Sequence, residues 1–115
     1  MNMDEAKKDF LIGFFIYGLT IFLIYYLWQT NISLTLTFIV MSAFVLLKWA
    51  NKEEKIVYIA SFILGPVIDI ALVPRGVWTY GNPSFFGAPF WLPFSYGVLT
   101  VTAIKIGKST AKLLK

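Results

Sequence analysis

Long apolar segments alternate with short polar stretches along this chain. The first two apolar segments, 10–28 and 32–49, are separated by the polar turn Gln29-Thr30-Asn31. Each would extend for about 24 to 28 Å as an α-helix, close to the roughly 30 Å thickness of a bilayer's hydrocarbon core. A lone strand in lipid would leave its backbone hydrogen bonds unsatisfied, so the pattern predicts two membrane-spanning helices.

Two further apolar segments, 56–73 and 89–106, follow a charged stretch. The third segment contains Gly65 and Pro66, and we predict a kink there because proline removes a backbone hydrogen-bond donor. The fourth segment contains Pro93 close to its start, and we predict a bend there for the same reason.

The pattern as a whole predicts one all-α domain, residues 1–115, built from four transmembrane helices with an ordered loop, 74–88, between the third and the fourth. Composition points the same way: 58% of residues are hydrophobic and 14% are charged, against roughly 25% charged in soluble domains. We interpret the first segment as a retained span, because signal peptides have shorter apolar regions and end in a small-x-small cleavage site.

Cationic residues are distributed unevenly about the predicted spans. Of the 10 Lys and Arg residues, only Arg75 lies in a loop on the side opposite the termini. Because cationic loops tend to stay in the cytoplasm, we predict a multi-pass protein of the cell membrane with cytoplasmic N- and C-termini. The loop 74–88 then faces the extracytoplasmic side.

The last residues form a basic tail, 105–115. Its lysines recur at helical spacing and would share one face of a helix that continues beyond the fourth span. We expect this face to lie on anionic lipid headgroups, in preference to a specific protein contact. The lysines are Lys105, Lys108, Lys112 and Lys115.

The chain contains no cysteine and no histidine. These absences exclude disulfides, thiolate zinc sites, iron–sulfur clusters, His-ligated haem or copper, and nucleophiles activated by histidine. No other catalytic or phosphate-binding motif is present. We therefore predict a protein that is not itself catalytic and that binds no metal or cofactor. The net charge of +4 comes from residues at membrane edges, so we expect no nucleic-acid partner.

Asp69 is the acidic residue within a predicted span. Burying a charged group at the centre of a bilayer costs at least roughly 2.5 kcal/mol on insertion scales, so a charged residue there usually has a structural or functional role. A structural explanation is that Asp69 pairs with Arg75 or accepts backbone N–H groups of the loop. A functional explanation is a protonatable or cation-binding group. We favour the structural one, because structural ion pairs also perturb carboxylates. The candidate polar site comprises Asp69, Arg75, Trp78, Tyr80, Asn82 and Tyr96.

The loop after Asp69 is rich in glycine, proline and aromatic residues. Glycines and prolines alternate from Pro74 to Pro89, which predicts a stiff, turn-rich backbone. Aromatic residues are dense from Trp78 to Tyr96. An interfacial aromatic belt explains some of them, but a loop this long is unusual in so small a fold. We therefore interpret the loop as a packed external cap over Asp69.

Several short motifs in this region form a recognisable pattern. They are Gly65-Pro66-x-x-Asp69, Trp78-x-Tyr80, Gly87-x-Pro89-x-Trp91-Leu92-Pro93 and Tyr96-Gly97. The pattern resembles small polytopic membrane proteins of bacteria and archaea in which an acid within one span precedes a Trp/Tyr/Pro-rich loop and a Trp-Leu-Pro helix start. In those proteins a tryptophan is expected where this chain has Tyr96. The resemblance implies a fold and no established activity.

Two other classes of membrane protein are similar in size. Small multidrug exporters have the same number of spans, but they rely on a glutamate in the first span, and segment 10–28 contains no acid. Non-catalytic subunits of membrane enzyme complexes, such as archaeal membrane monooxygenases, are also similar, although without a shared residue motif.

The sequence therefore predicts a small non-catalytic subunit or accessory factor of a larger membrane protein complex. Four short helices bury little surface against one another, so we expect the bilayer and other membrane subunits, or further copies of the chain, as partners. The alternative is a small carrier or transporter, acting as an oligomer, that binds a cation or proton at Asp69.

Overall fold

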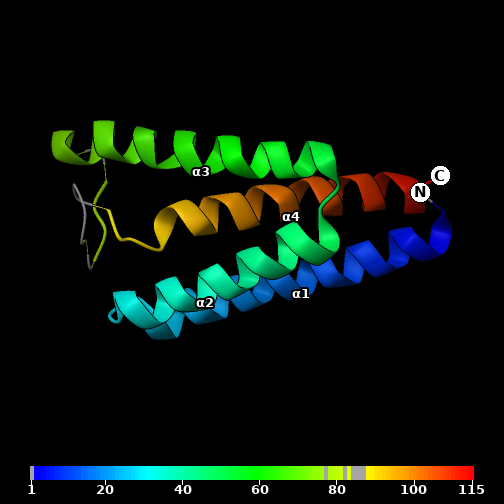
Figure 1. Cartoon of the computed structure of the whole chain (residues 1–115), viewed down its shortest axis with the longest axis horizontal. Helices are drawn as coiled ribbons and strands as arrows, with labels where there is room; N and C mark the ends of the chain where they lie inside the picture. The colour runs from blue at the N-terminus through cyan, green and yellow to red at the C-terminus, as the bar shows by residue number, and fades with distance from the viewer. Residues whose placement is uncertain (1, 77, 82, 84–87) are drawn as a thin grey trace.

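The computed structural model describes residues 2–76, 78–81, 83 and 88–115. Every regular element among these residues is helical (Figure 1). A π-helical turn continues the second helix and a 3-10 turn continues the third. The elements are α1 (Met3–Leu27), α2 (Asn31–Phe44), the π turn η1 (Val45–Trp49), α3 (Lys52–Leu72), the 3-10 turn η2 (Val73–Arg75) and α4 (Leu92–Leu113).

Three stretches of helix are long and apolar enough to cross a membrane. They are α1, α2 together with its π turn (Asn31–Trp49), and α3 together with its 3-10 turn (Lys52–Arg75). Most side chains of these stretches face outward, including large apolar ones such as Leu11, Ile32 and Leu64. An all-helical membrane protein is the fold class that the hydrophobic pattern predicts.

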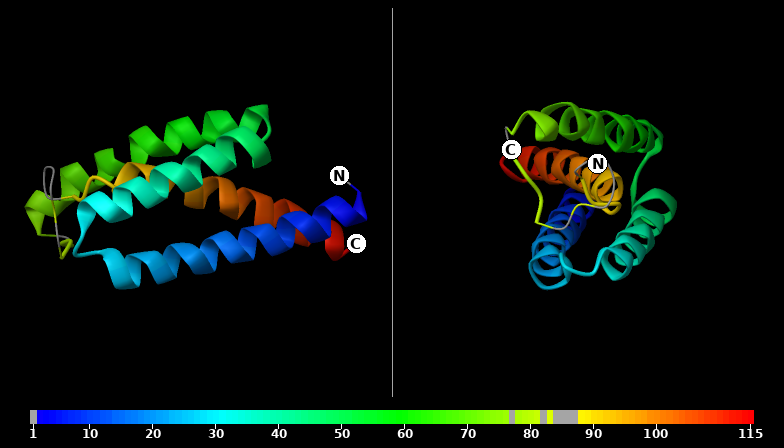
Figure 2. Two further views of the ribbon diagram at one scale, coloured as in Figure 1. Left: turned by 60° about the horizontal axis from the view of Figure 1, so that its bottom comes forward. Right: turned by 90° about the vertical axis from the view of Figure 1, so that its left-hand side faces the viewer.

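Helix α4 is the central helix of the bundle. It packs against α3, α1 and α2, and the end-on view shows it among them (Figure 2). Its buried hydroxyl groups bond to carbonyls of their own helix: Ser95 to Leu92, and Thr102 to Val98, each at 2.7 Å. Hydroxyls satisfied in this way can be buried at little cost, which explains why the innermost helix is less apolar than the helices around it.

The bundle has two chemically different ends. Both termini lie at one end, where α3 also begins (Figure 1). We call this the charged end, because it contains the buried residues Glu54 and Lys105. The opposite end contains the α1–α2 turn, the end of α3 and the start of α4 (Figure 1). We call it the aromatic end, because Trp78, Tyr80 and Trp91 lie there.

Two glycines make room for tyrosine rings where α3 packs against α4. A Cβ atom on Gly65 of α3 would lie 2.4 Å from the ring of Tyr96 on α4. A Cβ on Gly97 of α4 would likewise lie 2.4 Å from the ring of Tyr58 on α3. Each helix therefore presents a glycine to a tyrosine of the other. Gly65 makes room for this contact, and α3 is one continuous helix with Pro66 inside it. The predicted kink at Gly65 and Pro66 stays a prediction.

The start of α4 differs from the prediction. The helix begins at Leu92, not Pro89, and runs to Leu113. Pro93 lies in the first turn, where the missing N–H would have no helical partner. It therefore fits the first turn of the helix, and the predicted bend at Pro93 stays a prediction.

Candidate functional site

Asp69 lies in the last turns of α3 at the aromatic end and is completely buried. Its carboxylate accepts three hydrogen bonds from neutral side chains. Oδ1 accepts from Trp78 Nε1 and from the Tyr80 hydroxyl, each at 2.8 Å. Oδ2 accepts from the Tyr96 hydroxyl, also at 2.8 Å. Both oxygens of a buried acid are thus bonded, as burial of a charged group requires.

Local backbone features bring these donors together. After the 3-10 turn, Gly76 takes a left-handed conformation with φ of 78°, which glycine adopts without steric cost. The residues that follow include Trp78 and Tyr80, both bonded to Asp69. Tyr96 comes from the second turn of α4, and its ring is placed by the close contact with Gly65. Donors from two separate segments therefore converge on the carboxylate that α3 carries.

The hydroxyl of Tyr80 remains a proton donor in this arrangement. Burial raises the pKa of Tyr80, and the hydrogen bond to Asp69 raises it further. A phenolate beside the carboxylate would place two negative charges together, which is unfavourable in a poorly solvated site. The cluster of Asp69, Trp78, Tyr80 and Tyr96, which we call the Asp69 cluster, thus holds one acid among neutral donors.

Two residues of the predicted polar site remain to be placed, namely Arg75 and Asn82. Arg75 lies on the exposed surface of the 3-10 turn and forms no ion pair within the described residues. The predicted Asp69–Arg75 pair is therefore replaced by neutral donors. Asn82 lies outside the described residues, so its predicted place in the site stays a prediction.

A second polar cluster lies at the charged end and involves Lys105. Its ammonium group is 3.1 Å from Glu54 Oε1 and 3.7 Å from Asp9 Oδ2. Lys105 is only 8% exposed, and Glu54 is 2% exposed. The prediction that Lys105 faces lipid with the tail lysines is wrong, because two acids on neighbouring helices draw it into the bundle. Lys108 is half exposed and lies 3.5 Å from Glu54 Oε2.

The π turn at the end of α2 completes this charged cluster. Its last residue, Trp49, donates its indole N–H to Asp9 at 2.9 Å. The Lys105 ammonium lies 5.4 Å from the centre of the Trp49 ring, within cation–π range. Glu54 also closes a capping box with Asn51 at the start of α3. The charged cluster therefore joins the four helices at one end of the bundle.

The polar groups of the two clusters bind other groups of the protein. Within the described residues, no group of three or more metal-ligating side chains comes together. The acids of both clusters are engaged by hydrogen bonds or ion pairs. Between the clusters, the Thr102 hydroxyl bonds to its own helix, as does the Ser109 hydroxyl one turn beyond Lys105. These arrangements favour a structural role for both clusters.

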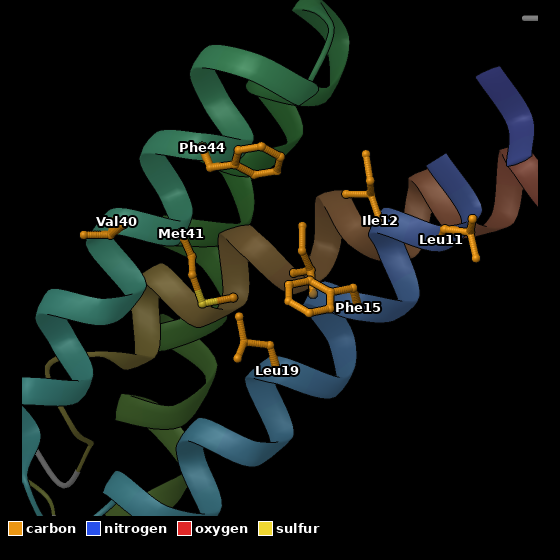
Figure 3. Close-up of a pocket in the computed structure, with 8 residues that line it drawn as sticks. Leu11, Ile12, Phe15, Leu19, Val40, Met41 and Phe44 are labelled. Carbon is orange, nitrogen blue, oxygen red and sulfur yellow. The ribbon is translucent and has the colours of Figure 1, made fainter. Parts of the chain in front are cut away.

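Two of the grooves on the lateral surface of the bundle differ in their lining. One lies between α1 and α2, has a volume of about 440 Å³ and is lined by large apolar side chains such as Phe15, Leu19 and Phe44 (Figure 3). The other, which we call the α1–α4 groove, has a volume of about 630 Å³. Its lining residues are Phe14, Tyr17, Leu99, Ala103, Ile106 and Gly107.

The start of α3 and the α4 side of the α1–α4 groove each have a sequence motif that an analysis of hydrophobicity alone misses. Asn51-x-x-Glu54 is the spacing of a capping box and indicates the start of α3. Ala103-x-x-x-Gly107 is a small-x-x-x-small motif, which is typical of contacts between membrane helices. Comparisons with protein-family models, curated proteins and solved structures found no match to this chain.

Proposed function

We propose that this protein is a non-catalytic subunit or accessory factor that binds a transmembrane helix of another membrane protein in the α1–α4 groove. The observation that carries the proposal is the chemistry of the α4 side of this groove. Ala103 and Gly107 line it at a spacing of one helical turn, and both are exposed. Ala111, one turn further along α4, is exposed as well.

A row of small residues suits a protein helix as the occupant. Membrane helices have little hydrophobic driving force for association, so they depend on close van der Waals packing. Small residues let two backbones approach, and Gly107 has open space around the position of a Cβ. A partner helix in this groove would gain contact along the backbone of α4.

The groove between α1 and α2 provides a comparison within the same molecule. Its lining consists of large, flexible apolar side chains such as Leu11, Leu19 and Met41 (Figure 3). Lipid tails are as apolar as leucine, so a surface of this kind gains little from exchanging lipid for protein. We assign this groove to lipid acyl chains and the α1–α4 groove to the partner helix.

The proposed orientation in the membrane follows from the same arrangement. In this orientation α4 is the fourth span, and the other helices shield most of its surface from lipid. The charged end faces the cytoplasm and the aromatic end faces outward, in accordance with the distribution of lysines. Lys112 and Lys115 of the tail then lie at the level of anionic headgroups.

A carrier that uses Asp69 is the second candidate, and one observation favours it. The Asp69 carboxylate is buried among neutral donors without a cation beside it in the described residues. Such a carrier should fold normally as Asp69→Asn and lose cation-dependent transport in proteoliposomes. We rank it second because the hydroxyls of Ser95, Thr102 and Ser109 on α4 bond to carbonyls of their own helix and provide no continuous polar path.

Photocrosslinking from the groove tests the proposal. A photoreactive phenylalanine analogue at Gly107 should crosslink to one membrane protein of defined mass when the cells are irradiated. The same analogue at Ala60, an exposed residue of α3, provides the control and should crosslink mainly to lipid. Equal protein adducts from both positions, or none from Gly107, would contradict the assignment of the groove.

A further inference from the structure

The groove between α1 and α2, which we call the α1–α2 groove, is lined near the start of α1 and near the end of α2 (Figure 3). Its lining residues extend from Leu11 to Leu19 on α1 and from Val40 to Phe44 on α2. Leu11 and Leu19 are separated by about 12 Å along the helix, which is close to the roughly 15 Å of hydrocarbon in one leaflet. The groove therefore has the composition and the length to hold an acyl chain of the leaflet at the charged end.

Each of the two helices that line the α1–α2 groove carries a lysine one turn beyond the lining. On α1, Lys8 precedes Leu11 by three residues and Ile12 by four, which is the spacing of neighbours on one helix face. Lys48 follows Phe44 by four residues, within the π turn that continues α2. The two helices are joined by a turn at the aromatic end and run in opposite directions (Figure 1). Both lysines therefore lie toward the charged end, where the groove meets the headgroup region.

The charges of these two lysines are not compensated by acids of the described chain. Lys8 and Lys48 are exposed, and neither forms an ion pair among the described residues. The acid next to Lys8 in the sequence is Asp9, which accepts a hydrogen bond from Trp49 and lies 3.7 Å from the Lys105 ammonium group. Its negative charge is thus engaged inside the bundle. An anionic group at this end of the groove would be attracted by both lysines.

The α2 side of the groove is ordered by contacts within the protein. The ring of Phe44 stacks on that of Trp49 at a centroid distance of 6.5 Å. Trp49 is itself only 9% exposed and is held by its hydrogen bond to Asp9. A wall that is already in place loses little conformational freedom when a ligand binds. These contacts favour a site for a bound molecule over a surface that lipids only wet.

We propose that the α1–α2 groove holds one acyl chain of an anionic phospholipid whose phosphate is bound by Lys8 and Lys48. The apolar lining matches the chain, and the two uncompensated cations match the phosphate. Lysine side chains can extend to the headgroups while their stems stay on apolar surface, and basic sites between membrane helices bind anionic headgroups in this way. The inference rests on the assignment of this groove to lipid under the proposed function, and it requires no partner helix in the α1–α4 groove.

Native mass spectrometry of the purified full-length chain in detergent tests the headgroup part of the proposal. Phosphatidylglycerol and phosphatidylcholine with the same acyl chains are titrated separately. Phosphatidylglycerol should form a saturable adduct of one molecule and bind about 25-fold more tightly, because each lysine beside an anionic group contributes a factor of about five. Lys8→Gln and Lys48→Gln should each weaken its binding about fivefold. Lys55→Gln, the same change at an exposed lysine of α3, should leave it unchanged.

A matched pair of valine variants tests the groove itself. Val40 lines the groove and is 69% exposed, whereas Val67 lies on α3 and is 53% exposed. Val40→Trp should abolish the saturable adduct because the indole fills the groove, and Val67→Trp should retain it. Circular dichroism of both variants reports that the helices are intact.

Three results would overturn the proposal. They are equal affinities for the two lipids, equal losses for Lys8→Gln and Lys55→Gln, which would indicate a diffuse attraction of the whole charged end, and an adduct that persists in Val40→Trp. None of these results bears on a protein complex that depends on Ala103 in the α1–α4 groove. The lipid site and the partner helix can therefore fail separately.

Discussion

The hydroxyl of Tyr96 should stabilise the fold much more than that of Tyr58. The two residues occupy equivalent places, since each packs its ring on a glycine of the facing helix. Tyr96 donates to the Asp69 carboxylate at 2.8 Å, whereas Tyr58 donates to the neutral hydroxyl of Ser42. Replacing either tyrosine by phenylalanine retains the ring contact and removes only the hydroxyl, so the two variants form a matched pair.

The expected magnitudes follow from the two acceptors. A hydrogen bond to a charged group contributes about 1.5–3 kcal/mol, so Tyr96→Phe should lower the free energy of unfolding by about 2 kcal/mol. Neutral hydrogen bonds between membrane helices average about 0.6 kcal/mol, which is the cost expected for Tyr58→Phe. In an Asp69→Asn background the acceptor is neutral, so the cost of Tyr96→Phe should decrease by about 1 kcal/mol.

Unfolding by sodium dodecyl sulfate in mixed micelles, followed by circular dichroism, gives these free energies. Arg75→Gln serves as a control, because Arg75 is exposed and unpaired among the described residues, and its unfolding free energy should not change. Equal costs for Tyr96→Phe and Tyr58→Phe, or an unchanged cost of Tyr96→Phe beside Asp69→Asn, would refute this account of the cluster. If Arg75→Gln lowered the free energy of unfolding, and this loss were not additive with that of Asp69→Asn, the two residues would form the ion pair that the sequence predicted.

Two further predictions concern the charged cluster and the orientation of the chain. Lys105→Met should lower the free energy of unfolding by about 3 kcal/mol, because it leaves the buried Glu54 carboxylate with fewer partners. Lys112→Met should leave the free energy of unfolding almost unchanged in the same experiment. Equal losses for the two variants would mean that Lys105 faces lipid with the other tail lysines. A single cysteine at Thr79 should react with a membrane-impermeant maleimide on intact cells, whereas one at Glu53 should react only after permeabilisation, and the reverse labelling would invert the proposed orientation.

The three helices that are long and apolar enough to cross a membrane could be predicted from the sequence because their outward-facing residues are apolar. The exposed faces of α1, α2 and α3 are apolar, so uninterrupted apolar segments reveal them directly. Helix α4 is the innermost helix and carries buried polar residues such as Thr102 and Lys105. Its start at Leu92 depends on packing and could not be located from hydropathy alone, whereas its continuation to Leu113 agrees with the helical spacing of the tail lysines.

Asp69 and its donors show what proximity in sequence can and cannot predict. The density of aromatic residues after α3 indicated a cap over Asp69, and Trp78, Tyr80 and Tyr96 do bond to it. Arg75 is nearer to Asp69 in the chain than any of these residues, yet it lies on an exposed turn. Charge and sequence distance do not determine where a side chain points after a helix ends.

Lys105 was misassigned for a different reason. Helical spacing places it with Lys108, and periodicity carries no information about which helices are neighbours. Its partners, Glu54 and Asp9, lie on α3 and α1 and are brought together only by tertiary packing. The π turn that positions Trp49 at this site also leaves no mark on the hydrophobic pattern.

The most direct test of the proposed function is native mass spectrometry of the protein after gentle extraction from its own membrane. The account predicts a discrete complex with another membrane protein for the unaltered chain. Ala103→Leu, which fills the α1–α4 groove, should dissociate that complex, and Ala60→Leu, the same change on the exposed face of α3, should leave it intact. The account would be contradicted if the protein were detected alone or only with copies of itself, or if the complex remained intact in the Ala103→Leu variant.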